Sequence, residues 1–109
     1  MRARPSFYEE EDAAFPGLQA RLSVGRAATL LDRLARKTGY RLPRLSFSHG
    51  SDVHFATATR IHFLFGDLRP IVILHEWAHM IQQLEEPDSP HHGLHFATLV
   101  ALMVEICEF

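Results

Sequence analysis

Residues 71–84 constrain this chain more than any other stretch. They read Ile-Val-Ile-Leu-His-Glu-Trp-Ala-His-Met-Ile-Gln-Gln-Leu, and the only ionisable side chains among them are His75, Glu76 and His79. In a helix, with about 100° between successive residues, the apolar side chains of this run cover nearly every direction of the helical wheel. A helix that is apolar on all sides is a buried one. We therefore predict a core helix that carries two histidines and a glutamate.

The two histidines of this run form the pattern His-Glu-x-x-His. Four residues along a helix bring the second imidazole to within about 40° of the first, so His75 and His79 point into one space, as two zinc ligands require. Glu76 lies about 100° round the helix, where it can reach a water on the metal. A metal would also offset the cost of burying these polar groups. The alternative is that both histidines are hydrogen-bonded core residues without a metal.

Composition limits the class of protein. A chain of 109 residues with 47% hydrophobic and 22% charged residues is an ordinary globular domain. Its net charge of -2 argues against strong non-specific binding to nucleic acid. The single cysteine, Cys107, excludes an intrachain disulfide and a zinc ribbon built from cysteines. Because no stretch resembles a signal peptide or a membrane span, we expect a cytoplasmic protein without a membrane partner.

The chain divides into an arm and one domain. Residues 1–17 combine an acidic run with scattered aromatic residues and are predicted to form a solvated, partly ordered arm, whereas residues 18–109 form the single domain. Within the domain, helical spacing of apolar residues predicts an amphipathic helix over residues 23–38. Ser23 is its expected N-cap, and Gly39 follows its last residue.

The middle of the domain has the period-two pattern of strands. The predicted strands are residues 44–48, 53–57 and 60–65. Alternate side chains of the last strand should cover the helix that follows. That strand is also a candidate for edge pairing with an extended peptide. We expect Asp67 to cap the core helix and Pro70 to lie in its first turn.

A second core helix is predicted at the end of the chain. An acidic, turn-rich loop over residues 85–90 must end the first core helix, and residues 92–108 are again apolar on most sides. Strands followed by helices indicate an α+β domain. We expect a small antiparallel or mixed sheet of about three strands packed on the His-Glu-x-x-His helix, with one helix before it and one after.

Two linked motifs lie in the second half of the chain: His75-Glu76-Trp77-Ala78-His79 and His92-Gly93-Leu94-His95-Phe96. Together they resemble the SprT-like zinc metalloprotease domain, a minimal zincin of the Spartan/SprT superfamily, and the resemblance runs from about residue 38 to the end of the chain. It implies a zincin-like fold, one Zn²⁺ per chain held by His75, His79 and His92, and Glu76 as the general base. It also implies a protein or peptide substrate, and DNA as a partner by analogy with the Spartan relatives.

Four residues compete for the role of third ligand: His91, His92, His95 and Glu105. His92 follows His79 by thirteen residues, which is enough chain to turn and bring the next helix back to the metal. In one unbroken helix, Glu105 would lie about 20 Å from His92, so the two assignments exclude each other. We predict His92.

The expected function is that of a zinc-dependent metallopeptidase, in which zinc and Glu76 activate a water for attack on a peptide bond. Tyr40, His62 and His95 are candidates for stabilising the oxyanion. One rival is a zinc-stabilised, non-catalytic binding or regulatory module, which would gain nothing from Glu76 beside its ligands. Another is a peptidase of the immunity-repressor type, which shares His-Glu-x-x-His but differs in its third ligand.

Overall fold

The computed structural model describes residues 20–49, 54–88 and 93–107. Its elements are α2 (Val24–Thr38), β1 (Arg44–Ser48), β2 (Phe55–Ala56), β3 (Arg60–Leu64), the 3-10 helix η2 (Phe65–Asp67), α3 (Pro70–Glu85) and α4 (Leu94–Cys107). Three helices and a three-stranded sheet make an α+β domain, which confirms the predicted class. Within these ranges, the helices are all too short or too polar to cross a membrane.

The sheet is mixed, with strand order β1-β3-β2. β1 runs parallel to β3, with Arg44 opposite Arg60, and β2 runs antiparallel to β3, with Phe55 opposite His62. The prediction that β3 could pair with a peptide through its edge was wrong. Both sides of β3 are already occupied, so among the described strands the outer edges of the sheet belong to β1 and β2. Strand order depends on pairing between distant segments, which the alternation within one strand does not encode.

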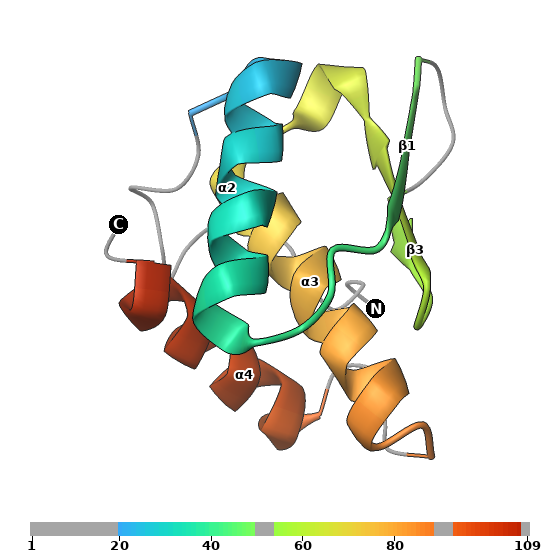
Figure 1. Ribbon diagram of the computed structural model, residues 1–109, viewed down its shortest axis with the longest axis vertical. Coiled ribbons are helices and arrows are strands. Elements are labelled where there is room, and N and C mark those ends of the chain that lie inside the picture. The colour runs from blue at the N-terminus through green and yellow to red at the C-terminus, as the bar shows by residue number, and fades with distance from the viewer. Residues whose placement is uncertain (1–19, 50–53, 89–92, 108–109) are drawn as a thin grey trace, which may run out of the picture.

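α3 is the centre of the domain. It lies between the sheet on one side and helices α2 and α4 on the other (Figure 1). Twelve of its sixteen residues are buried, which confirms the prediction of a helix covered on all sides. The inward face of β3 contributes Ile61 and Phe63, both fully buried, as the period-two pattern predicted. The His-Glu-x-x-His motif therefore lies on the best-covered element of the fold.

α2 has the capped, amphipathic form that its sequence predicts. The Ser23 hydroxyl accepts a hydrogen bond from the Arg26 backbone N–H over 3.2 Å, which satisfies one of the free amides of the first turn. Gly39 ends the helix at φ 78°, a left-handed conformation that glycine adopts without steric cost. The buried stripe of the helix comprises Ala27, Leu30, Leu31 and Leu34.

The start of α3 differs from the prediction. Asp67 was expected as its N-cap, but the N-cap is Arg69, whose side chain makes no capping hydrogen bond. Asp67 instead lies in η2, and its carboxylate accepts a hydrogen bond from the Arg69 guanidinium over 2.6 Å. Asp67 is the last residue of η2, so α3 begins only at Pro70 and its N-cap is Arg69. Pro70 occupies the first helical position, where its missing N–H costs nothing.

The central position of α3 leads to a stability prediction. The Trp77 side chain is 0% exposed, and Trp77→Ala should lower the free energy of unfolding by about 3–5 kcal/mol, because it removes buried apolar area and leaves a cavity. Leu84, on the same helix, is 46% exposed, so Leu84→Ala is the matched control and should cost about 1 kcal/mol or less. Urea denaturation measures both. Equal midpoints for the two variants would contradict the central placement of α3.

Candidate metal centre

The two motif histidines converge. His75 and His79 lie one turn apart on α3, and their Nε2 atoms are 3.1 Å apart. In a tetrahedral zinc site with Zn–N bonds of about 2.0–2.1 Å, two ligand nitrogens are separated by about 3.3–3.4 Å. The observed separation of 3.1 Å is close to this nitrogen–nitrogen distance, so the two Nε2 atoms are placed suitably for binding one zinc ion. The same separation also suits a hydrogen bond between two neutral imidazoles, which is the core-histidine alternative.

Phe96 holds both imidazole rings. Its side chain, which is 0% exposed, stacks on His79 with ring centroids 4.3 Å apart and meets His75 edge-on at 4.9 Å. Phe96 belongs to the first turns of α4, and the hydrogen bond from the Ala97 N–H to the Gly93 carbonyl, 3.1 Å long, shows that helical bonding begins at Gly93. The start of α4 therefore packs directly against the histidine pair. The sequence predicts Phe96 within a core helix but does not indicate its contact with the two histidines.

Glu76 lies beside the pair and is 2% exposed. Burying a carboxylate is costly unless a positive charge or hydrogen bonds stabilise it. Core helices rarely carry such a group, and buried ionisable residues cluster at functional sites. The adjacent positions of Glu76 and His75 on α3 thus bring a carboxylate and an imidazole into one buried region.

The third ligand is not decided by the described part of the chain. Residues 20–49, 54–88 and 93–107 contain no group of three His, Cys, Asp or Glu side chains that could hold a metal ion. His91 and His92 lie outside these ranges, so the assignment of His92 stays a prediction. Glu105 is exposed and follows Phe96 by nine residues of unbroken helix, about 14 Å along the axis. It does not join the histidine pair.

The first candidate for oxyanion stabilisation, His62, is held within the sheet. Its Nδ1 lies 2.7 Å from the Ser46 hydroxyl, and its Nε2 lies 2.9 Å from the Ser48 hydroxyl. Its ring also stacks on Phe55 at 5.1 Å. Both ring nitrogens are engaged with β1, so His62 ties β1 to β3.

The other two candidates are engaged at the end of α3. The Tyr40 hydroxyl donates to Glu85 over 2.5 Å, and this hydrogen bond is the main reason why the pKa of Tyr40 is raised. His95 lies 3.2 Å from the Glu86 carboxylate. Among the contacts of the described residues, no hydrogen bond joins Tyr40 or His95 to the histidine pair.

His54 is a buried histidine that sequence reasoning did not single out. Its Nδ1 accepts from the Leu64 N–H over 3.1 Å, and its Nε2 lies 3.4 Å from the Asp67 carboxylate. Burial lowers the pKa of His54, and the nearby Asp67 carboxylate opposes that shift. His54 therefore joins the start of β2 to the end of β3, and no periodicity in the sequence marks such a contact.

Comparison of the chain with family models, with curated proteins and with solved structures found no match. The resemblance to the SprT-like domain therefore rests on the motifs of the sequence itself. The geometry of the site is the independent ground on which its chemistry is argued.

Proposed function

We propose that this protein is a zinc-dependent metallopeptidase with a SprT-like, zincin-type site. His75, His79 and His92 would hold one Zn²⁺, and Glu76 would be the general base. The observation that carries the proposal is the 3.1 Å separation of the two Nε2 atoms on a buried helix, with Glu76 buried beside them. Burying His75 and Glu76 in a core helix costs free energy, and such buried ionisable residues cluster at functional sites.

Chain connectivity supports His92 as the third ligand. His92 directly precedes Gly93 in the sequence, and Gly93 accepts the first hydrogen bond of α4. It also lies four residues before Phe96, whose ring touches both histidines. Gly93, the described residue next to His92, therefore directly precedes the helix that packs on the histidine pair through Phe96. Glu105 lies near the other end of α4, nine residues beyond Phe96.

The chemistry of the site follows from its donors. A zinc ion held by neutral ligands lowers the pKa of a bound water to about 7 and polarises a carbonyl. His75 and His79 must be neutral to bind the metal, so acid weakens binding. With zinc bound, Glu76 would take the proton from the attacking water and would return it to the leaving amine. Phe96 packs on both imidazoles and keeps their orientation fixed.

The sheet offers a place for an extended peptide substrate. β2 is an edge strand, and it lies against α3. Its outer edge would hydrogen-bond to the main chain of a peptide laid beside it, which favours recognition of backbone over side chains. This corrects the expectation that β3 itself would pair with the substrate.

Elemental analysis of the purified protein, together with hydrolysis of casein, tests the proposed function. We expect one zinc per chain and hydrolysis that is lost with a chelator and restored by added zinc. One zinc per chain without hydrolysis of casein or of the protein itself would favour the non-catalytic, zinc-stabilised module. Absence of bound zinc after purification and after reconstitution would favour the hydrogen-bonded core histidines.

Zinc should also stabilise the fold. A ligand that binds only the native state raises the free energy of unfolding by about 4 kcal/mol when its free concentration is 1,000 times its Kd. Because about 1 kcal/mol shifts the Tm of a domain of this size by about 4–8 °C, removing zinc should lower the Tm by more than about 10 °C. Thermal unfolding with and without a chelator measures the shift. His75→Gln is the control, and its Tm should not respond to zinc.

A Tm indifferent to the chelator, in wild-type protein shown by elemental analysis to have lost its zinc, would contradict this coupling. His95→Ala serves as a second control, because His95 contacts Glu86 and should leave the zinc-dependent shift of the Tm unchanged.

A further inference from the structure

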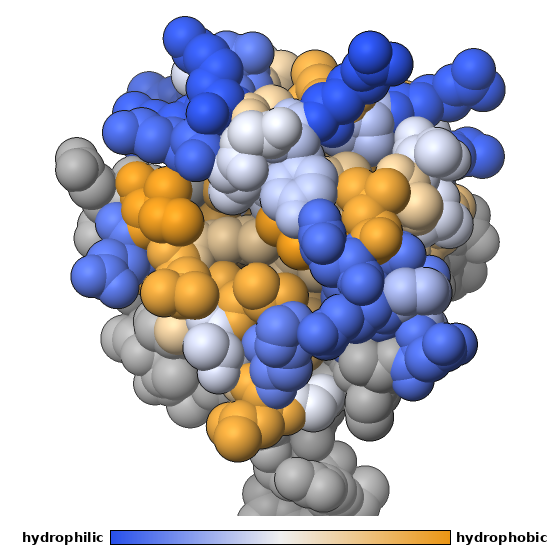
Figure 2. All heavy atoms as spheres, turned by 60° about the horizontal axis from the view of Figure 1, so that its bottom comes forward, coloured by the Kyte–Doolittle hydropathy of each residue, from blue (hydrophilic) through white to orange (hydrophobic). Residues whose placement is uncertain are grey.

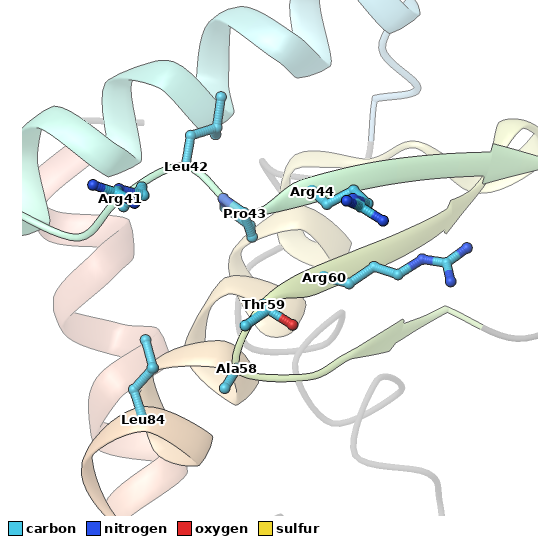
Figure 3. Close-up of a pocket in the computed structure, with 8 residues that line it drawn as sticks. All are labelled: Arg41, Leu42, Pro43, Arg44, Ala58, Thr59, Arg60 and Leu84. Carbon is cyan, nitrogen blue, oxygen red and sulfur yellow. The ribbon is translucent and has the colours of Figure 1, made fainter.

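An open groove lies away from the histidine pair, where the loop after α2, the first residues of β1 and β3, and the last turn of α3 meet (Figure 3). Its volume is about 630 Å³. Three arginines line it, namely Arg41, Arg44 and Arg60, and none of the described residues that line it is acidic. Neither His75 nor His79 belongs to the lining, so the groove is separate from the candidate metal centre.

Two of these arginines are placed side by side by the sheet. Arg44 and Arg60 are paired across β1 and β3, and their side chains extend in the same direction (Figure 3). Like charges directly opposite each other destabilise a sheet. The Arg60 guanidinium is also fixed in place, because it donates to the Ser46 hydroxyl over 3.2 and 3.1 Å and lies 5.8 Å from the centre of the Phe55 ring.

The positive charge of the groove is not neutralised by the described residues. The carboxylate partners seen in residues 20–49, 54–88 and 93–107 belong to other cations, such as Arg36 and Arg69, and none pairs with Arg41, Arg44 or Arg60. A bound anion between Arg44 and Arg60 would offset their mutual repulsion and accept charge-assisted hydrogen bonds.

The groove also has an apolar part. Leu42 is 42% exposed and Leu84 is 46% exposed, and both line it together with Pro43. Figure 2 turns the end of α3 and the start of α4 toward the viewer and shows hydrophobic side chains gathered on that face, bordered by hydrophilic ones. A ligand that fits must therefore combine negative charge with an apolar group.

We propose that this groove binds an acidic polypeptide segment of another protein, with carboxylates on Arg44 and Arg60 and an apolar side chain against Leu42 and Leu84. β1 is an edge strand, so its outer edge offers main-chain hydrogen bonds to such a segment. The proposal does not depend on the peptidase activity.

The observations favour a peptide over a nucleic acid. Among the described residues that line the groove, none is aromatic, whereas single-stranded nucleic acids are held by bases stacked on aromatic rings. The protein as a whole carries a net charge of -2 and a pI of about 6.4, which repels a long polyanion. A short acidic segment meets the local charge of the groove without spanning the rest of the surface.

Fluorescence polarisation of the full chain with a fluorescein-labelled peptide, in which glutamates are flanked by leucines, tests this proposal. We expect wild-type protein to bind this peptide and not its glutamine-substituted counterpart.

Arg44→Gln combined with Arg60→Gln should raise the Kd about tenfold, and Arg44→Lys should retain most of the affinity. Arg26→Gln, an exposed arginine on α2, is the matched control and should leave the Kd unchanged. Binding should weaken at about 1 M salt, where the Debye length is about 3 Å.

Equal affinity of the wild type and the Arg44/Arg60 double variant would overturn the proposal. A thymidine oligonucleotide that displaced the peptide at lower concentration than unlabelled peptide would assign the groove to nucleic acid instead. The chain's own acidic run, Glu9-Glu10-Glu11-Asp12, is the remaining competitor. A variant in which the three glutamates of this run are changed to Gln and the aspartate to Asn tests this. Much tighter peptide binding by that variant would show that the groove binds the internal segment, and would refute an external partner.

Discussion

Glu76→Gln is expected to leave zinc bound and the fold intact while hydrolysis of casein falls by about 10²–10⁴-fold, the contribution that one positioned general base makes. Glutamine matches the size of glutamate, so the packing around this buried position is retained. The glutamine side chain, however, cannot accept the proton from the attacking water. The measurements are initial rates of hydrolysis, zinc content and Tm, each compared with the wild type.

Glu105→Gln is the matched control for this variant, since it removes a carboxylate of the same chemistry from an exposed position on α4. Its rate should equal that of the wild type. Full activity in Glu76→Gln, with zinc at full occupancy, would refute the assignment of Glu76 as the base. Loss of zinc from Glu76→Gln would instead make Glu76 a ligand, which the approximately 100° between Glu76 and His75 on the helix argues against.

His92→Ala is expected to abolish tight zinc binding, because two imidazoles from one helical turn leave the ion with only two protein ligands, whereas catalytic zinc sites have three. Competition with a chromophoric chelator measures the affinity of each variant. His91→Ala and Glu105→Ala are the controls. Both should keep the affinity of the wild type, since His91 is adjacent to the proposed ligand and Glu105 lies about 14 Å beyond Phe96 along α4.

Retention of full zinc affinity by His92→Ala together with its loss from Glu105→Ala would reverse the ligand assignment. It would also require α4 to bend, because Phe96 and Glu105 are joined by unbroken helix. That result would remove the main support for the SprT-like interpretation while leaving His75 and His79 as ligands.

Local patterns predicted the parts of this protein that depend on neighbouring residues. The cap at Ser23 and the left-handed Gly39 follow from the conformational preferences of single residues, and the structure confirms both. The convergence of His75 and His79 follows from helical geometry, since residues four apart always share a face. The burial of α3 follows from apolar residues on every side of it.

Contacts between distant segments were decided only by the tertiary structure. The central position of β3, the cap at Arg69 and the placement of Phe96 on both imidazoles depend on how elements pack against one another. The pairing of Arg44 with Arg60 likewise depends on the parallel register of β1 and β3, which are neighbours in the sheet although β2 lies between them in the sequence. Periodicity within a segment records which face is buried but not which partner buries it. The sequence alone therefore determined the helix that carries the two histidines, and the packing of α4 and the sheet decided what surrounds it.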